Sequence, residues 1–478
     1  MITNRIGSCN MTKLPQKFID NMIYLLGEEG FEAYRECLEK PMWHALRVNT
    51  SKISVDDFKK LLPYSLREVP WCENGFYYDS SEWTPSKHPY YYAGLYYLQE
   101  PSAMLPAASI PICPGDKVLD ICAAPGGKST ELFCRLKDDG FLVSNDISAS
   151  RAKALLKNLE VFGADRIAIT CEEPAELAKH FGAYFDKIII DAPCSGEGMF
   201  RKSYSMITAW EQNGNELFMN IQHSILNEVV KMLKPDGMIL YSTCTFAPME
   251  DEQSVEYLLS KDEALELLEI PCHEGFVKGR PDWGNTNNED MTKTVHLFPH
   301  LVEGEGHFAS LFHKKISDAE DVFANCSDAI PYSGKLTPEI KEFLAHVSLP
   351  GMTNSRLELK KERLFYLPDG CPDVSGLRIL RQGLLLGEQK KQRFEPSQAL
   401  AMRLSPESYD NFLSFSESDE RTIKYLKGET IEVTEEEKKN AKLYDGWVLI
   451  GVDGFSLGFG KLKGTTIKNK YLPGWRLQ

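Results

Sequence analysis

One stretch decides the fold, Val118-Leu-Asp-Ile-Cys-Ala-Ala-Pro-Gly-Gly-Lys128. A short apolar run containing Asp120 ends in a turn of small residues, and a helix-like segment follows from Lys128 to Leu136. Gly126 and Gly127 carry no Cβ and can adopt positive φ, so a ligand can approach their backbone closely. The first turn of the helix leaves N–H groups free beside them. The stretch therefore predicts a ligand-binding turn at the end of a strand.

A second predicted strand, Phe141–Asn145, is followed directly by Asp146. In doubly wound folds an acid at this place binds the hydroxyl groups of a ribose. The preceding turn matches neither the phosphate-binding pattern G-x-x-x-x-G-K nor the dinucleotide fingerprint G-x-G-x-x-G. Together these features predict a site for an adenosine-type cofactor. The alternative role for Asp146 is to cap the next helix, near Ser148 and Arg151.

Strand and helix patterns alternate over the middle of the chain. The predicted strands are Lys117–Ile121, Phe141–Asn145, Arg166–Thr170, Lys187–Asp191 and Met238–Thr243, and the predicted helices are Ser150–Phe162, Pro174–His180 and Met219–Leu233. Such alternation is typical of a mainly parallel sheet covered on both faces, a Rossmann-like α/β domain. A last strand within Gly304–Phe312 is predicted to pair with the edge of this sheet. Ligands bind such sheets at the carboxyl ends of the strands.

Two cysteines stand at predicted strand ends: Cys194 in Asp191-Ala-Pro-Cys-Ser-Gly196, and Cys244 in Ser242-Thr-Cys-Thr245. A single cysteine is most often inert core packing. A cysteine in a Pro-Cys-Ser-Gly turn and another between threonines are poorly explained that way. A reachable thiolate is a nucleophile, and from chemistry alone either residue could attack. The twelve cysteines have no repeated spacing and no C-x-x-C pair, so the pattern favours reduced thiols over a metal site or a disulfide framework.

The segments Asp120–Lys128, Asp191–Gly196 and Ser242–Thr245 resemble, in order and spacing, three motifs of the Sun-type RNA cytosine-5 methyltransferases. The resemblance implies S-adenosylmethionine (SAM) as cofactor and a cytosine in RNA as substrate. It places Asp146 at the ribose hydroxyls and Glu173 near the adenine, where the adjacent Glu172 could serve instead. The loop around the methionine and ribose would comprise Cys122, Ala123, Ala124, Pro125, Gly126, Gly127 and Lys128.

The resemblance also implies the roles of three catalytic residues. Cys244 would attack carbon 6 of the cytosine, because carbon 5 is a poor nucleophile until a thiolate adds beside it. Cys194 would release the product by removing the carbon 5 proton, and Asp191 would hydrogen-bond the ring edge near nitrogen 3 while also lining the cofactor site. The alternative for Asp191 is a turn acid at a strand end. The target base must leave its stack to reach the thiolate.

A chain of 478 residues has room for about three domains. We expect an N-terminal α/β extension (1–98), a SAM-dependent methyltransferase domain (99–316), a linker (317–331), a middle basic domain (332–404) and a β-rich domain (405–478). Strands and glycine turns alternate within Gly446–Gly458. This last part resembles the PUA-like RNA-binding module of the bacterial RsmF-like ribosomal RNA methyltransferases, the branch that the chain is most similar to.

The net charge of −15 is unusual for a protein that binds nucleic acid, but the basic residues are clustered. The segment Lys461–Gln478 contains five basic residues and no acid. The middle domain carries Lys360, Lys361, Arg363, Arg378, Arg381, Lys390, Lys391 and Arg393. The Arg201-Lys202 pair would contact RNA phosphates or lie on a solvated surface. Tyrosines between Tyr77 and Tyr97 would stack on bases or pack at a domain junction.

By analogy the PUA-like tail favours small-subunit (16S) ribosomal RNA, or the ribosomal subunit, as partner. Two alternatives stay open: a transfer RNA cytosine-5 methyltransferase, and a catalytically silent RNA-binding factor for ribosome assembly. The sequence contains no apolar run of about 18 residues, so no membrane span is predicted. The N-terminus lacks the apolar core of a signal peptide. We therefore expect a monomeric cytoplasmic enzyme without a bound metal.

Overall fold

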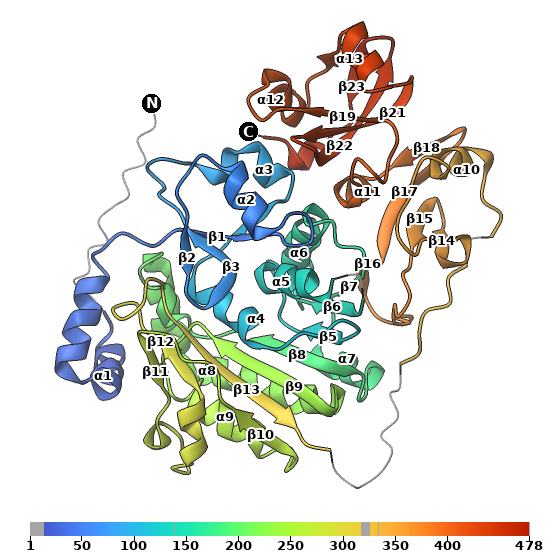
Figure 1. Ribbon diagram of the computed structural model, residues 1–478. Coiled ribbons are helices and arrows are strands. Elements are labelled where there is room, and N and C mark those ends of the chain that lie inside the picture. The colour runs from blue at the N-terminus through green and yellow to red at the C-terminus, as the bar shows by residue number, and fades with distance from the viewer. Residues whose placement is uncertain (1–13, 138, 317–325, 333, 478) are drawn as a thin grey trace.

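The computed structural model describes residues 14–137, 139–316, 326–332 and 334–477 (Figure 1). Residues 1–13 of the expected N-terminal extension and 317–325 of the expected linker lie outside the described residues. At the centre is a ten-stranded sheet with the order β11-β12-β13-β9-β8-β5-β6-β7-β16, in which β10 also pairs with β13. The expected Rossmann-like fold is confirmed.

The parallel part of this sheet consists of the predicted strands. It contains β9 (Leu233–Thr243), β8 (Phe185–Asp191), β5 (Lys117–Asp120), β6 (Phe141–Asn145) and β7 (Ile167–Thr170). Ile188, Ile189 and Ile190 are all buried, as expected of a strand covered on both faces. The carboxyl ends of β5, β8 and β9 therefore lie next to one another and bring the three motifs to one rim.

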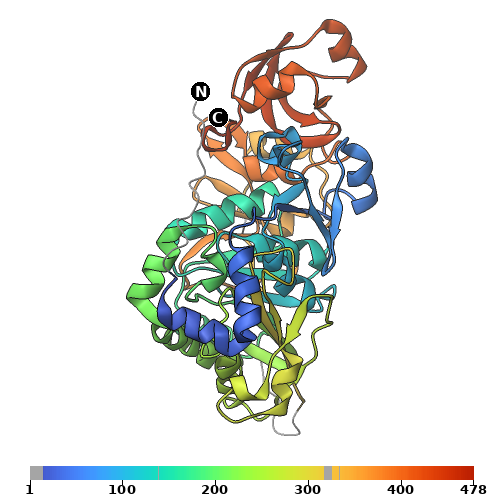
Figure 2. The same cartoon turned by 90° about the vertical axis from the view of Figure 1, so that its left-hand side faces the viewer.

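Helices cover both faces of the sheet. α4 (Leu105–Ser109), α5 (Gly127–Leu136) and α6 (Ala149–Val161) pack on one face, and α7 (Pro174–His180), α8 (Tyr204–Met232) and α9 (Glu252–Leu259) pack on the other. The predicted helix Met219–Leu233 is the second half of α8, which breaks at Gly214 (φ 66°, ψ 175°). α1 (Gln16–Cys37) buries Phe18 and Met22 against Trp210 of α8, and Figure 2 shows the two helices side by side.

The last strand predicted within Gly304–Phe312 is confirmed as a partner of β9, the edge strand of the parallel part, although it is not the outermost strand of the whole sheet. β13 (His307–Lys314) pairs antiparallel with β9, but β12 (Val295–Leu297) and β11 (Phe276–Lys278) extend the sheet beyond it, and β10 (Leu265–Leu268) pairs with it as well. These short strands carry little periodicity of their own. They are strands because a neighbouring edge offers each of them a partner: β13 pairs with β10 and β12, and β12 pairs with β11.

The other edge of the sheet is covered from a distant part of the chain. β16 (Ile379–Gln382) pairs antiparallel with β7, and Arg381 within it forms a buried ion pair with Glu160 of α6 at 2.7 Å. The unpaired edge of β7 would otherwise expose a row of backbone N–H and C=O groups. Residues from the C-terminal part of the chain thus complete the central sheet.

Three smaller sheets surround the core. The N-terminal sheet contains β1 (Ala45–Val48), β2 (Arg67–Val69), β3 (Cys72–Tyr77) and β4 (Tyr96–Leu98), with helices α2 (Val55–Leu61) and α3 (Pro89–Tyr92). The middle sheet contains β14 (Leu357–Lys360), β15 (Arg363–Tyr366), β17 (Leu384–Lys390) and β18 (Arg393–Pro396), with α10 (Pro338–Leu344) and α11 (Gln398–Arg403).

The last sheet contains β19 (Phe412–Phe415), β20 (Ile431–Glu432), β21 (Gly446–Val452), β22 (Phe455–Lys463) and β23 (Thr466–Asn469), with α12 (Glu420–Leu426) and α13 (Glu435–Asn440). The strand and turn pattern predicted within Gly446–Gly458 corresponds to β21, a turn at Asp453-Gly454 and the start of β22.

Tyrosines of the N-terminal unit pack against the C-terminal sheet. Tyr90 and Tyr96 share one buried cluster with Tyr425 and Tyr471, and the Tyr90 hydroxyl donates to Asp453 at 2.9 Å. Figure 1 shows the two units in contact at the top of the molecule. Of the two readings of the tyrosine-rich segment, packing at a domain junction is correct for these rings.

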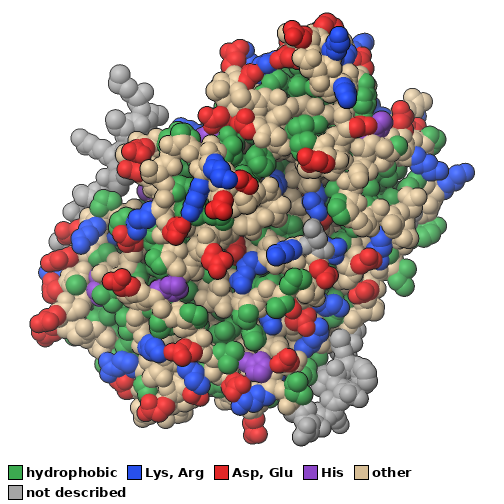
Figure 3. Space-filling model, viewed as in Figure 1, with side chains coloured by type: hydrophobic (Ala, Val, Ile, Leu, Met, Phe, Trp, Pro, Cys, Tyr) green, Lys and Arg blue, Asp and Glu red, His purple; other side chains and the backbone are tan. Residues whose placement is uncertain are grey.

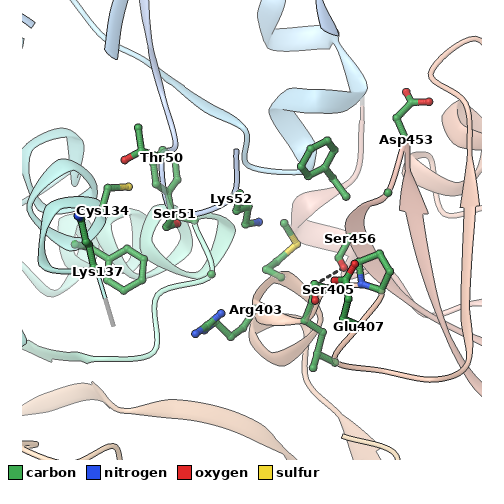
Figure 4. A pocket seen from close by; sticks show the side chains of 18 residues that line it. Thr50, Ser51, Lys52, Cys134, Lys137, Arg403, Ser405, Glu407, Asp453 and Ser456 are labelled. Carbon is green, nitrogen blue, oxygen red and sulfur yellow. Dashed lines mark hydrogen bonds between the residues drawn. The ribbon is translucent and has the colours of Figure 1, made fainter. Parts of the chain in front are cut away.

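A cavity of about 640 Å³ opens where these units meet the core (Figure 4). Lys52, Lys137 and Arg403 line it together with Glu407 and Asp453, so charges of both signs face it. Lys52 is held in place because its ammonium group donates to the carbonyl oxygens of Ala93 and Val161 at 2.8 and 2.9 Å. The motif residues do not line this cavity; their own site lies elsewhere on the core.

The expected basic clusters are less basic than their sequence suggests. Figure 3 shows acidic and basic side chains interspersed over one face of the molecule. Ion pairs join Lys360 to Glu358, Arg363 and Lys390 to Glu388, Arg378 to Glu172, Arg381 to Glu160 and Arg393 to Glu395. Acids on the same strand, on a neighbouring strand or distant in sequence therefore neutralise much of the middle unit.

Candidate active site

The glycine turn has the geometry that its sequence predicts. Gly126 has a φ of 114° and Gly127 begins α5. A Cβ on Gly127 would lie 3.0 Å from the Gln99 side chain and 3.2 Å from the Tyr97 ring. Glycine is required at both positions, at Gly126 for its backbone conformation and at Gly127 because the N-terminal unit packs against it.

A pocket of about 230 Å³ opens beside this turn. Its lining includes Cys122, Ala123, Ala124, Pro125, Gly127 and Lys128, with Asp120 and Asp191. The segment Tyr97–Ala103, which connects the N-terminal sheet to the core, forms another wall through Tyr97, Leu98, Gln99, Glu100 and Ala103. Sequence reasoning missed this wall, because no motif in the segment signals a ligand.

Asp146 is buried and held against the loop. One of its carboxylate oxygens accepts the backbone N–H of Ala124 at 3.3 Å, and the other accepts that of Ser148 at 2.9 Å. The cap of α6 is Ser148, whose hydroxyl accepts the N–H of Arg151. The alternative reading of Asp146 as the helix cap is therefore wrong, and its carboxylate lies against the loop at Ala124.

The two adjacent acids after β7 differ in their surroundings. Glu172 is buried and accepts three hydrogen bonds from Arg378, from its backbone N–H and its guanidinium group, at 2.6 to 3.1 Å. The hydrogen bonds and charge of Arg378 lower the pKa of Glu172. Glu173 is exposed at the start of α7. Glu172 is thus engaged by a distant arginine, while Glu173 faces solvent.

Asp191 is bound from two sides at the end of β8. Lys128 Nζ lies 2.6 Å from one carboxylate oxygen, and His307 Nε2 lies 3.6 Å from the other. The Ser242 hydroxyl donates to Asp191 Oδ1, the oxygen nearer to His307, at 3.3 Å. Burial acts to raise the pKa of Asp191, but the charge of Lys128 and the nearby ring of His307 outweigh it and hold that pKa below its ordinary range. Asp191 is therefore ionised at neutral pH.

The strands β8 and β9 are neighbours in the sheet (Figure 1). The two motif cysteines follow their carboxyl ends and meet there. Their sulfur atoms are 3.1 Å apart, and the backbone N–H of Cys244 donates to the Cys194 sulfur at 3.3 Å. The hydrogen bond with the Cys244 side chain, together with burial, raises the pKa of Cys194 well above its ordinary value.

The structure corrects both readings of Arg201. Its side chain is 5% exposed and forms an ion pair at 2.6 Å with Glu305, which is also 5% exposed. It also donates to the backbone carbonyl of Cys37, at the end of α1, at 3.0 Å. Arg201 is therefore a buried link between α1 and the loop before β13, and is neither a phosphate ligand nor a solvated surface charge.

The buried Arg201–Glu305 ion pair should contribute to the stability of the fold. Arg201→Met should destabilise the fold by about 3 to 5 kcal/mol, because the carboxylate of Glu305 would stay buried without its partner. The free energy of unfolding in denaturant measures the loss. Lys202→Met, at the exposed neighbouring position, should leave that free energy almost unchanged. Equal losses in the two variants would contradict a structural role for the Arg201–Glu305 pair.

The described residues contain neither a metal-binding cluster nor a membrane-spanning helix. Within them, no three or more histidine, cysteine, aspartate or glutamate side chains gather in a way that could hold a metal ion. None of the helices in the described ranges is both long and apolar enough to cross a bilayer.

Family models match the chain in four consecutive segments. The model for the 16S rRNA methyltransferase RsmB/F matches residues 109–313, and the N-terminal domain of 16S rRNA methyltransferase RsmF matches 14–101. The first C-terminal domain of the RsmF rRNA methyltransferase matches 342–404, and the methyltransferase RsmF PUA domain matches 412–477.

Curated relatives match over nearly the whole chain. Ribosomal RNA small subunit methyltransferase F from Vibrio parahaemolyticus is 28% identical over 95% of this chain and 96% of its own length. The protein of the same name from Erwinia tasmaniensis is 29% identical over 96% of this chain and 95% of its own length.

Solved structures match a little under two thirds of the chain. A methyltransferase homolog protein from Pyrococcus horikoshii superposes with a TM-score of 0.55 at 29% identity, over 64% of this chain and 96% of that one. NSun6 from the same organism, solved with SFG, has a TM-score of 0.53 at 19% identity over 63% and 99% of the two chains. The second likeness shows a shared fold.

The fold and the site at its rim define a SAM-dependent methyltransferase. The chain belongs to the RsmB/F family of RNA methyltransferases, with the domain order of RsmF. The family, the fold class and the cofactor inferred from the three motifs are confirmed. The residues present suit SAM, because the glycine turn exposes backbone to the pocket and the buried carboxylate of Asp146 lies against that turn.

Proposed function

We propose that this protein forms 5-methylcytosine in the 16S RNA of the small ribosomal subunit, through a covalent bond between Cys244 and carbon 6 of the cytosine. The observation that carries the proposal is the pair of sulfur atoms 3.1 Å apart beside the ionised Asp191. Two thiols at one strand rim, next to the cofactor loop, suit a reaction that needs a nucleophile and a base at the same ring.

The chemistry divides between the two cysteines. The Cys244 thiolate adds to carbon 6, and the electron pair of the carbon 5–carbon 6 double bond makes carbon 5 nucleophilic. SAM, when bound, supplies the methyl group that carbon 5 takes up. Cys194, a strong base once ionised because its pKa is raised, removes the carbon 5 proton. The bond between sulfur and carbon 6 then breaks, and the pair returns to the Cys244 sulfur.

The remaining residues bind and orient. Asp191, ionised beside Lys128, accepts a hydrogen bond from the cytosine edge and lines the cofactor pocket. The loop Cys122–Lys128 holds the methionine and ribose of SAM, and Asp146 accepts from the ribose hydroxyls. Glu173 takes the position near the adenine, because Glu172 is already engaged by Arg378.

The substrate is inferred from the relatives, whose names specify small-subunit ribosomal RNA, and from the match to the RsmF PUA domain. A monomer acting in the cytoplasm is part of the same proposal. A transfer RNA substrate remains the second candidate, since the catalytic core by itself does not distinguish RNAs. The two thiols and the ionised Asp191 at one rim argue against a catalytically silent assembly factor.

The test is transfer of labelled methyl groups from SAM to purified small ribosomal subunits and, separately, to transfer RNA. Label recovered as 5-methylcytosine in the subunit RNA is the expected result. Label in transfer RNA alone would keep the chemistry and overturn the substrate. No label in either RNA, with SAM still bound, would overturn the enzymatic proposal in favour of the silent factor.

A further inference from the structure

Buried hydrogen bonds join the two loops that carry the cysteines. The Ser195 hydroxyl, next to Cys194, lies 2.8 Å from the Thr245 hydroxyl, next to Cys244. The backbone N–H of Ser195 donates to Glu250, further along the loop after β9, at 2.9 Å. The turn that holds Cys194 is therefore attached to the loop of Cys244 at the residue beside each sulfur.

Glu250 is the centre of this arrangement. It is 0% exposed, and in addition to Ser195 it accepts the side-chain amides of Asn215 and Gln222, both of α8, at 2.9 Å. Burial raises the pKa of Glu250 to about 7, and the Ser195 and Asn215 hydrogen bonds act against that rise. Its carboxylate is thus held by N–H donors on two separate elements.

Asn215 connects α8 to both loops. It is 3% exposed, and its amide nitrogen lies 3.0 Å from the Ser195 hydroxyl, 3.0 Å from Glu197 and 2.9 Å from Glu250. It follows directly after Gly214, whose φ of 66° breaks the helix. The break therefore lies at the point where α8 contributes this side chain.

Such a polar cluster is costly for a fold, because carboxylates and amides are desolvated where apolar side chains would pack without that loss. The cluster contacts the residues that flank the thiols, at Ser195 and Thr245. The carbonyl of Cys244 also accepts the N–H of Gly198, in the other loop, at 2.9 Å. These hydrogen bonds fix the Cys194 turn relative to the end of β9.

We propose that Asn215 and Glu250 are positioning residues that hold Cys194 against Cys244 for the release step. The inference rests on the function proposed above. In that step the Cys194 thiolate takes the proton from carbon 5, and the C–H electron pair forms the carbon 5–carbon 6 double bond. The bond between carbon 6 and the Cys244 sulfur breaks, and its pair returns to that sulfur. Cys244 extends from β9, which is paired on both sides with β8 and β13.

Loss of the cluster should therefore displace Cys194 more than Cys244. Addition to carbon 6 would continue while release slows, so the covalent enzyme–RNA adduct would accumulate although both cysteines are present. A merely structural role would lower the stability of the protein, and the amounts of adduct and product would fall together.

The experiment compares full-length Asn215→Ala with Asn220→Ala, an exposed asparagine of the same helix, on small ribosomal subunits with labelled SAM. We expect turnover of Asn215→Ala to fall about 10- to 100-fold, as for misplacement of a reacting group by about 1 Å. We also expect adduct on a denaturing gel at several times the wild-type level. Asn220→Ala should match the wild type in both measurements.

Glu250→Gln is the second variant and tests the proposal if Asn215→Ala does not fold. It keeps the side-chain volume but replaces an acceptor by an N–H donor that faces other donors, and adduct should again accumulate. Unchanged turnover, or slower turnover without adduct in a folded variant, would overturn the inference. Cys194→Ala distinguishes failure of this inference from failure of the proposed function. Adduct in Cys194→Ala without adduct in Asn215→Ala would refute only the positioning role. Absence of adduct in both variants would refute the covalent route itself.

Discussion

Replacement of Cys244 by alanine is expected to abolish methyl transfer to RNA while leaving the fold and SAM binding in place. Cys244 is only partly buried and lies outside the loop proposed to bind SAM, so its loss removes the proposed nucleophile and little else. Removal of an essential nucleophile lowers the turnover number by on the order of 10⁴-fold or more. Incorporation of labelled methyl groups into small ribosomal subunits measures the loss.

The matched control is Cys272→Ala, which removes an exposed thiol and should transfer methyl groups like the wild type. Binding of SAM to Cys244→Ala, measured by calorimetry, should be unchanged. If Cys244→Ala retained activity and Cys194→Ala lost all covalent chemistry, the roles of the two cysteines would be reversed.

Replacement of Cys194 by alanine is expected to trap the enzyme on its RNA. Cys244 can still add to carbon 6, but the base that removes the carbon 5 proton is gone, so release fails. General base catalysis contributes roughly 10²- to 10⁴-fold, and multiple-turnover activity should fall within that range. A protein–RNA adduct that survives a denaturing gel, approaching one RNA per enzyme, is the direct observation.

The double variant Cys194→Ala, Cys244→Ala should form no adduct, because the attacking sulfur is absent. Adduct in the double variant would point to another nucleophile. Free product and no adduct in Cys194→Ala would show that a different group removes the proton.

Much of the core could be predicted because its signals are local. The apolar runs of β5, β6, β7, β8 and β9 and the glycine turn after β5 are contiguous in sequence. The predicted bounds lie close to the observed ones, except that β9 begins at Leu233 rather than at Met238. The motifs follow strand ends, so the parallel topology by itself brings them to one rim.

Other elements depend on distant partners and escaped prediction. The short strands β10, β11, β12 and β16 form because neighbouring edges offer backbone hydrogen bonds, and their own sequences are too brief to show a period. The charge of Arg201 was misread for the same reason, since its partner Glu305 lies about one hundred residues further along the chain.

By itself the sequence determined the order of the motifs, the residues able to carry the chemistry and the class of fold, because each depends on short-range pattern. Only the tertiary structure decided how those groups are paired: Lys128 with Asp191, Arg378 with Glu172, and Asn215 with Glu250. These partners come from elements far apart in the chain. Burial, hydrogen bonding and pKa are therefore properties of the packed molecule, since they depend on which atoms packing brings within about 3 Å of one another.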